Sequence, residues 1–133
     1  MPYTGAVRRW DIYWADLEPV VGSEQRGERR PVIVVSNDGV NAKFTVVTVV
    51  PATKAEGKKR KPYPFELVLP AGVITADHGS IVMPYQIRTL SKLRLLERIG
   101  RLEDPEYRAQ IENRLLEHLD IAFEEELPDE SES

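Results

Sequence analysis

The chain has 133 residues, of which 41% are hydrophobic and 30% are charged, and it contains no cysteine. This length is typical of one domain, and the lack of cysteine excludes a disulfide framework, thiolate metal ligands and a cysteine nucleophile. No apolar run approaches the roughly 20 residues that a transmembrane helix needs, and the first residues show no signal-peptide pattern. We therefore expect a soluble, cytoplasmic domain without a membrane partner.

The net charge of −4 is unevenly distributed along the chain. Residues 124–133 contain six carboxylates and no basic residue, so residues 1–123 carry a net charge of about +2. We expect one globular domain over residues 1–123 and a disordered acidic tail over residues 124–133. A basic body beside an acidic tail is consistent with a nucleic-acid partner, although such a tail equally serves solubility alone.

The first two-thirds of the chain shows short apolar runs separated by turn-forming residues. Residues 7–15 alternate aromatic or branched side chains with polar ones, which predicts a half-buried strand. A polar loop over 18–30 leads to a second strand at 32–35, which ends at the turn-forming residues 36–39. This spacing predicts a mainly β protein of α+β type, a small barrel or curled antiparallel sheet of about six or seven short strands. The remaining strands are expected at 44–50, 65–69, 80–83, 86–90 and 97–102.

Only the C-terminal part of the chain predicts a long helix. Asp104 is a suitable N-cap, and Pro105 suits the first helical position. Apolar residues at four-residue spacing then form a stripe, which we expect to pack against the sheet. The stripe consists of Tyr107, Ile111, Leu115 and Leu119, widened by Leu116, Ile121 and Phe123. A single helical turn is also expected within residues 91–96.

Two basic loops between strands are the main chemical feature of the sequence. Arginine matches phosphate oxygens bidentately and lysine supplies mobile charge, so both loops favour a nucleic-acid backbone; plain solvated surface is the alternative. Tyr63 and Phe65 flank the second loop and offer a stacking face for bases, but Phe65 equally suits the core because it opens a strand. The first loop contains Arg26, Arg29 and Arg30, and the second contains Lys54, Lys58, Lys59, Arg60 and Lys61.

The sequence lacks the common cofactor motifs. It has no histidine pair at helical spacing and no glycine-rich phosphate loop, so neither a zinc site nor a nucleotide-phosphate cradle is expected. His78 and His118 stand in unrelated contexts and are expected to be ordinary surface or structural residues. The four carboxylates between residues 11 and 24 are chemically suited to magnesium, but their spacing does not demand it. We therefore expect no metal and no cofactor.

Five short segments, in a fixed order and spacing, form the most specific pattern in the chain. They are Gly22-Ser23-Glu24-Gln25, then Arg30-Pro31 before a valine-rich strand and Ser36-Asn37-Asp38, then Val50-Pro51 with Thr53, then Tyr63-Pro64-Phe65-Glu66, and finally Gln86-Ile87-Arg88-Thr89. Together they resemble the MazF/PemK toxin family over roughly residues 7–120. The resemblance implies a small SH3-like β-barrel, or curled sheet, with a C-terminal α-helix, usually paired as a homodimer.

The resemblance also implies an activity, partners and site residues. Family members are toxins of type II toxin–antitoxin systems and sequence-specific, metal-independent endoribonucleases, which cut single-stranded RNA, chiefly messenger RNA, and so stop translation and growth. A MazE-like antitoxin covers their RNA groove with an acidic C-terminal arm. The catalytic arginine and threonine of the family fall on Arg30 and Thr53, and Glu24 is a candidate base. RNA binding is expected from Ser23, Gln25, Arg26, Arg29, Lys54, Lys58, Lys59, Arg60, Lys61, Tyr63, Gln86 and Arg88.

The sequence also allows two other classes of function. A CcdB-like toxin that binds DNA gyrase without catalysis would need neither Arg30 nor Thr53. A non-cleaving RNA-binding module would bind RNA and produce no new 5′ ends. Tyr85 also stands before Gln86 where an acidic residue is common in the family, which leaves the base preference open.

Overall fold

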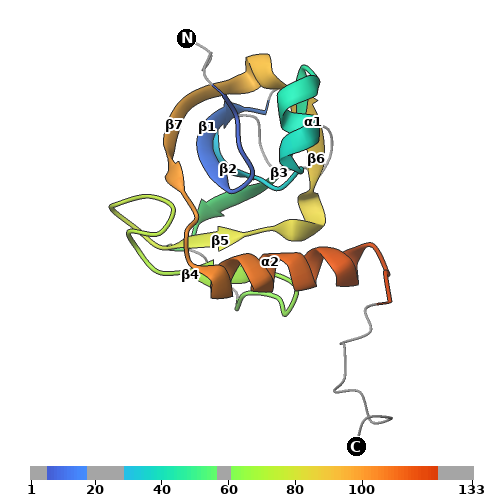
Figure 1. Cartoon of the computed structure of the whole chain (residues 1–133). Helices are drawn as coiled ribbons and strands as arrows, with labels where there is room; N and C mark the ends of the chain where they lie inside the picture. The colour runs from blue at the N-terminus through green and yellow to red at the C-terminus, as the bar shows by residue number, and fades with distance from the viewer. Residues whose placement is uncertain (1–5, 18–28, 57–60, 123–133) are drawn as a thin grey trace, which may run out of the picture.

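The structure is a computed structural model that describes residues 6–17, 29–56 and 61–122. The described residues form a seven-stranded antiparallel sheet and two α-helices (Figure 1). The elements in chain order are β1 (Asp11–Asp16), β2 (Arg29–Val34), α1 (Asp38–Lys43), β3 (Val46–Lys54), β4 (Leu67–Leu69), β5 (Ser80–Val82), the 3-10 turn η1 (Pro84–Gln86), β6 (Arg88–Ser91), the 3-10 turn η2 (Lys92–Arg94), β7 (Leu95–Arg101) and α2 (Pro105–His118).

The sheet is organised around β3, which is nine residues long. One edge of β3 pairs with β2, while its other edge pairs first with β6 and then with β5. The strand order is β4-β5-β3-β2-β1-β7, with β6 beside the first half of β3. The sheet curls on itself without closing into a barrel (Figure 1). The expected curled antiparallel sheet with a C-terminal helix is therefore confirmed.

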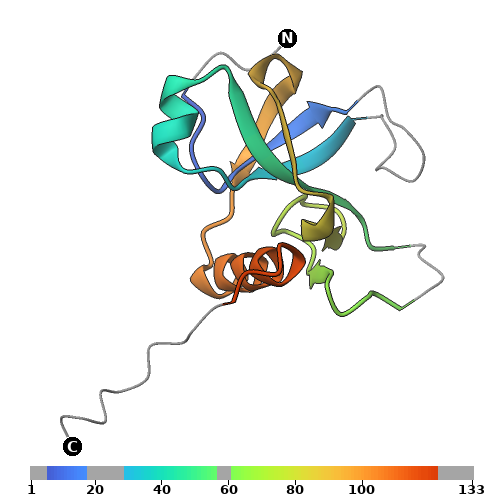
Figure 2. The ribbon, with the colours of Figure 1, turned by 90° about the vertical axis from the view of Figure 1, so that its right-hand side faces the viewer.

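The sheet has two apolar faces because its residues alternate between two sides. The inner face, which carries Val32 and Val34 of β2, encloses one core within the curl. The outer face, which carries Ile33 of β2, forms a second core against α2. Figure 2 shows α2 as a separate layer beside the sheet. We call these the inner core and the helix-side core.

Helix α2 confirms the cap and most of the expected stripe. The Asp104 carboxylate accepts the Glu106 backbone N–H at 2.9 Å, and Ile111 is fully buried in the helix-side core. Burial of such a side chain contributes about 1.5–3 kcal/mol to folding. The prediction was wrong for Leu119 and Ile121, because the helix stops at His118 and leaves both exposed, while Phe123 lies outside the described residues. No described helix is both long and apolar enough to cross a membrane.

Helix α1 lies where the sequence predicts only a turn. Six residues form it, and the Asn37 side chain caps it by accepting the Val40 backbone N–H at 2.9 Å. Asn41 is buried and donates from its amide to the Ser36 carbonyl at 2.8 Å. A buried polar side chain with satisfied hydrogen bonds thus holds a helix that is too short to be stable by itself.

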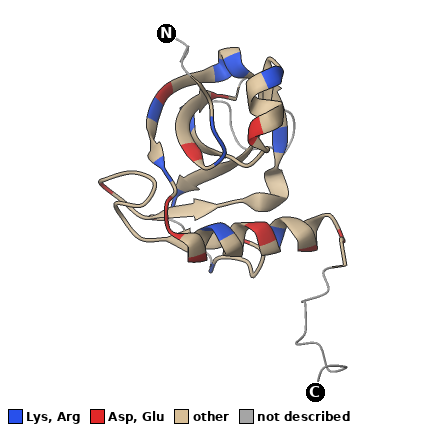
Figure 3. Ribbon diagram, in the orientation of Figure 1, with Lys and Arg blue, Asp and Glu red and all other residues tan. Residues whose placement is uncertain are grey.

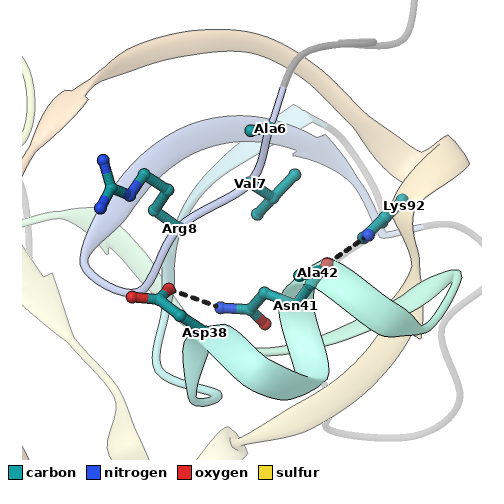
Figure 4. Close-up of a pocket in the computed structure, with 7 residues that line it drawn as sticks. All are labelled: Ala6, Val7, Arg8, Asp38, Asn41, Ala42 and Lys92. Atoms are coloured by element: carbon teal, nitrogen blue, oxygen red, sulfur yellow. Dashed lines mark hydrogen bonds between the residues drawn. The ribbon is translucent and has the colours of Figure 1, made fainter.

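A hollow opens between α1 and the N-terminal segment of the described chain (Figure 4). At its rim, the Lys92 ammonium donates to the carbonyl oxygen of Asn41. The Asp38 carboxylate accepts the backbone N–H of Arg9 at 2.7 Å. This hydrogen bond favours the charged form and holds the pKa of Asp38 below its ordinary value. Side-chain contacts therefore tie α1 to the segment that precedes β1.

The start of β1 differs from the expected strand at 7–15. The strand begins at Asp11 because Trp10 has φ 75°, a left-handed conformation that is uncommon for a bulky residue. Two backbone hydrogen bonds hold it there: the Trp10 N–H donates to Val34 at 2.7 Å, and its carbonyl accepts from Leu102 at 2.8 Å. Trp10 is buried in the helix-side core and joins β2 to the chain that leads into α2.

Buried Asp11 is the centre of a charged corner at the β1–β7 pair. Its Oδ1 atom lies 3.2 Å from guanidinium nitrogens of both Arg98 and Arg101. Its Oδ2 atom accepts the Arg8 backbone N–H at 3.0 Å and the Tyr13 hydroxyl at 3.4 Å. We call Asp11, Arg98 and Arg101 the aspartate corner. The carboxylate is fully partnered, as a buried charge must be.

Candidate functional site

The register of β2 and β3, when continued toward Arg30, sets that residue opposite Thr53. The two strands pair Val34 with Val49 and Val32 with Pro51. Continuing this register by two residues sets Arg30 against Thr53. Both residues fall on the inner face, because Arg30 alternates with Val32 and Val34 along β2. This extended register sets two residues that are more than twenty positions apart in sequence opposite each other at the edge of the inner core.

The strands on either side complete a row across the sheet. Ala15 of β1 lies opposite Arg30, and Ile81 of β5 lies opposite Thr53. Ala15 and Ile81 are both buried. Arg30 and Thr53 thus stand on an apolar support, where electrostatic interactions are stronger than in open water.

Thr53 is 7% exposed, yet its hydroxyl makes no hydrogen bond to any residue that the structure describes. Within the same residues, no buried side-chain oxygen or nitrogen lacks a partner. The Thr53 hydroxyl therefore reaches the surface and is available to a ligand. Arg30 beside it is half-buried, which limits the directions in which its guanidinium can point.

Arg88 of β6 extends this surface along β3. It lies opposite Val49, so it shares the inner face with Arg30 and Thr53. Arg88 is half-buried, and within the described ranges its guanidinium has no hydrogen-bond or ion-pair partner. Along β3, the position opposite Arg88 lies four residues, or about 13 Å, before Thr53. We call Arg30, Thr53 and Arg88 the inner-face cluster.

The turn η1 connects this cluster with the segment that follows the second basic loop. Met83, just before η1, donates its N–H to the Pro51 carbonyl at 2.9 Å. Buried Glu66 accepts the Tyr85 hydroxyl at 2.8 Å and the Tyr63 N–H at 2.9 Å. Gln86 ends η1 and is half-buried. Glu66 therefore holds the start of the β6 segment against the residues around Tyr63.

Three aromatic rings cluster around this connection. Tyr63 stacks on Phe65 with ring centroids 5.0 Å apart and an angle of 19° between the ring planes. Phe65 meets the edge of Tyr85 at 5.2 Å. Phe65 is 44% exposed because β4 begins only at Leu67, and it belongs to neither core. The structure thus favours a surface role for Phe65 over the core alternative.

Arg29 does not join Arg30. Because β2 already begins at Arg29, the two neighbouring side chains point to opposite faces. Arg29 lies on the outer face, where it forms an ion pair with Glu97 at 3.5 Å. The sequence missed this separation because it assigned both arginines to a loop.

The remaining predicted residues divide between described and undescribed segments. Lys54 ends β3 rather than lying in the loop, and Lys54 and Lys61 are both exposed. Away from these predicted residues, basic and acidic residues are interspersed along β7 and α2 (Figure 3). Outside the described residues lie Ser23, Glu24, Gln25, Arg26, Lys58, Lys59, Arg60 and the tail at 124–133.

Among the carboxylates and histidines noted in the sequence, those that the structure describes do not gather at the cluster, and Glu18 and Glu24 lie outside the described residues. Asp11 belongs to the buried corner, while Asp16 is exposed on the other face of β1. His78 contacts the Thr75 hydroxyl at 3.2 Å in the loop before β5. His118 is exposed in the last turn of α2. Sequence reasoning gave no role to Glu66, although an isolated carboxylate in an apolar run is a signal for a buried hydrogen-bonding role.

Comparisons with known proteins match nearly all of the described chain. The family model of PemK-like, MazF-like toxins of type II toxin–antitoxin systems matches residues 8–119. Endoribonuclease EndoA of Bacillus subtilis is 41% identical over 98 residues, which cover 74% of this chain and 82% of that protein. Endoribonuclease MazF9 of Mycobacterium tuberculosis is 39% identical over 120 residues, covering 86% and 98% respectively.

Solved structures with the same fold include MazF from Deinococcus radiodurans. The TM-score is 0.73 at 25% identity, and the match covers 89% of this chain and all of that one. A mycobacterial endoribonuclease in complex with its cognate antitoxin has a TM-score of 0.68 at 22% identity, covering 91% of this chain. The curled sheet and C-terminal helix are therefore shared with these proteins.

Proposed function

The chain belongs to the family of PemK-like, MazF-like toxins of type II toxin–antitoxin systems, and from this premise we propose that it cuts single-stranded messenger RNA at a short sequence motif without a metal ion. Its class as an endoribonuclease is confirmed by relatives that are 41% and 39% identical over most of the chain. The finer proposal is supported by the register of β2 and β3, whose continuation sets Arg30 opposite Thr53 on the inner face, and by the available Thr53 hydroxyl.

The proposed reaction uses the RNA's own 2′-hydroxyl as nucleophile. The 2′-oxygen forms a bond to the adjacent phosphorus while the bond to the 5′-oxygen breaks. A base takes the 2′ proton, and the leaving 5′-oxygen gains a proton, giving a 2′,3′-cyclic phosphate and a 5′-hydroxyl. The protein must hold the backbone in line, stabilise the pentacoordinate dianion and assist proton transfer.

The inner-face cluster supplies groups for the first two tasks. The Arg30 guanidinium donates charge-assisted hydrogen bonds to the phosphate oxygens and stabilises the dianion, or acts as acid toward the 5′-oxygen. Arg30 is not the base, because a guanidinium does not readily give up its proton in a protein. The Thr53 hydroxyl holds a phosphate oxygen or positions Arg30. Glu24, outside the described residues, is our candidate for the base.

The RNA chain is proposed to follow β3 from Thr53 toward Arg88. Both arginines of the inner-face cluster lie on that path, and the exposed Lys54 and Lys61 add charge beside its Thr53 end. Gln86 and Tyr63 offer an amide and a stacking surface for bases. The predicted residues of the two loops that lie outside the described ranges are included in this proposal.

The proposed partners are those of a toxin–antitoxin pair. A MazE-like antitoxin with an acidic C-terminal arm would cover the basic RNA-binding surface, and a mycobacterial endoribonuclease of the same fold is known in complex with its antitoxin. We further propose a homodimer that acts in the cytoplasm, where messenger RNA is found.

The proposal is tested by incubating a long, unstructured RNA with the purified protein in EDTA and mapping the new ends. We expect cuts at one short motif with 5′-hydroxyl and 2′,3′-cyclic phosphate ends, and none with Arg30→Ala. RNAs of varied sequence that all stay intact would contradict catalysis, and gyrase inhibition would then be the next assay. RNA binding without new ends would indicate the non-cleaving module.

A further inference from the structure

Three side chains on the outer face of the sheet form a small surface site of their own. Trp14 of β1 is half-buried and belongs to neither core. Arg29 of β2 lies over its indole ring and forms an ion pair with Glu97 of β7. Together these three residues line a hollow of about 380 Å³. A partly exposed indole beside two charged groups is suited to a planar ligand with polar edges.

The contacts among the three residues are easily opened. The Arg29 Cζ atom lies 6.0 Å from the centroid of the Trp14 ring, at the outer limit of a cation–π contact. Arg29 and Glu97 are 57% and 76% exposed and 3.5 Å apart. Exposed ion pairs of this kind add little stability, so a ligand can displace or share them at small cost.

The 6.0 Å separation of Arg29 from the Trp14 ring is close to the space that one inserted ring needs. Stacked atoms prefer contacts of about 3.5 Å, so a flat ring with a neighbour on each side needs about 7 Å. Arg29 would have to move outward by about 1 Å. Unpaired RNA bases are commonly held in this way, between an aromatic side chain and an arginine plane.

The carboxylate of Glu97 selects among the bases. An ionised carboxylate only accepts hydrogen bonds. Guanine presents two neighbouring donors, N1–H and N2–H, on its Watson–Crick edge, which match two carboxylate oxygens. Adenine, cytosine and uracil each place an acceptor beside their donor on that edge, and this acceptor repels the carboxylate. Guanine is therefore the base that Glu97 favours.

We propose that Trp14, Arg29 and Glu97 form a guanine subsite for the RNA on the outer face of the sheet. This inference rests on the proposed ribonuclease function. Because Arg29 directly precedes Arg30 on β2 but faces the other side, the guanine belongs to a nucleotide flanking the cut rather than to the reacting phosphate. The subsite thus contributes to the choice of cleavage motif.

The test titrates the full chain with the 5′-monophosphates of guanosine, adenosine, cytidine and uridine and follows the two indole N–H signals by NMR. Guanosine monophosphate should move the Trp14 signal at a concentration about tenfold lower than the others, while the Trp10 signal, from a buried ring, stays constant. Glu97→Gln should remove this preference. The matched control, Glu103→Gln, changes an exposed glutamate between β7 and α2 and should keep it.

Equal responses to the four nucleotides, no response, or a guanine preference that survives Glu97→Gln would each overturn the subsite. The NMR readout does not depend on cleavage, so failure of the subsite can be distinguished from failure of the proposed function. Guanine-selective binding by a protein that cuts no RNA would leave the subsite standing and contradict the ribonuclease. RNA cleavage without guanine selectivity at Trp14 would contradict the subsite alone.

Discussion

The inner-face cluster and the aspartate corner both contain two arginines on the same sheet, but their arginines are used differently. At the corner, Arg98 and Arg101 share the buried Asp11 carboxylate, which also accepts from Arg8 and Tyr13. In the cluster, Arg88 and the Thr53 hydroxyl have no partner among the described residues. Positive charge is neutralised in the first region, whereas in the second the charge of Arg88 is available to a ligand.

This difference distinguishes charge that stabilises the fold from charge that binds a ligand. A buried carboxylate with several donors is costly to disturb. A half-buried arginine without a partner contributes little to the stability of the fold, and its charge attracts an anion. The number of arginines in a stretch of sequence does not distinguish arginines that stabilise the fold from arginines that bind a ligand. Substitutions in the two regions should therefore affect stability and activity in opposite proportions.

Among substitutions that keep the shape of the side chain, the largest effect is expected for Thr53→Val, which removes only the hydroxyl. We expect RNA cleavage to slow by about 100-fold, with the unfolding midpoint nearly unchanged. The matched control is Thr48→Val on the same strand, where the hydroxyl pairs with Thr89 at 2.7 Å. Equal slowing by both variants would show that Thr53 acts through strand structure and not on the phosphate.

Asp11→Asn should produce the opposite result. The asparagine keeps the shape of the side chain but withdraws the negative charge from Arg98 and Arg101, which are 40% and 31% exposed. We expect the free energy of unfolding to fall by about 2 kcal/mol, measured by chemical denaturation, with cleavage per folded molecule retained. Asp77→Asn, at an exposed loop position, should change neither. A fully stable Asp11→Asn would contradict the structural role of the corner.

Arg88→Ala should weaken RNA binding by about tenfold without loss of stability. It should also reduce the slope of log affinity against log salt by about 0.7, the value for one phosphate contact on a single strand. Binding is measured with an RNA carrying 2′-deoxy sugars, which is not cut. Arg101→Ala should leave this slope unchanged, and an equal loss of slope in both variants would remove the distinction between the two regions.

The smallest effect concerns the acid sensitivity of α1. The hydrogen bond from the Arg9 N–H holds the pKa of Asp38 below its ordinary value. A lowered pKa contributes stability that is present above the unfolded-state value and is lost as the pH falls through the folded-state value. The stability difference between the natural chain and Asp38→Asn should therefore shrink below about pH 4. A difference in thermal midpoint that stays constant from pH 6 to pH 3 would contradict this.

Local patterns predicted the parts of the fold that depend on neighbouring residues. The cap at Asp104 and the apolar spacing through Ile111 locate α2, because both signals lie within the first turns of the helix itself. Helix α1 was not predicted, because its six residues include Gly39 and Asn41, which are poor helix formers. A buried amide contact to Ser36, visible only in the folded chain, supports it.

The candidate site shows the same division. Its residue types follow from motif resemblance, but the position of Arg30 opposite Thr53 follows only from continuing the register of β2 and β3, which no local pattern encodes. The opposite directions of Arg29 and Arg30 follow from where β2 begins. The sequence places that beginning at Val32, whereas pairing with β1 extends the strand back to Arg29.

The most direct measurement compares Arg30→Ala with Arg101→Ala for cleavage of one RNA in EDTA, with rates expressed per folded molecule. Our account predicts that Arg30→Ala folds and cuts no RNA, whereas Arg101→Ala is less stable and cuts at the natural rate. Cleavage by Arg30→Ala, or equal losses in the two variants, would contradict the claim that the inner-face cluster holds the reacting phosphate.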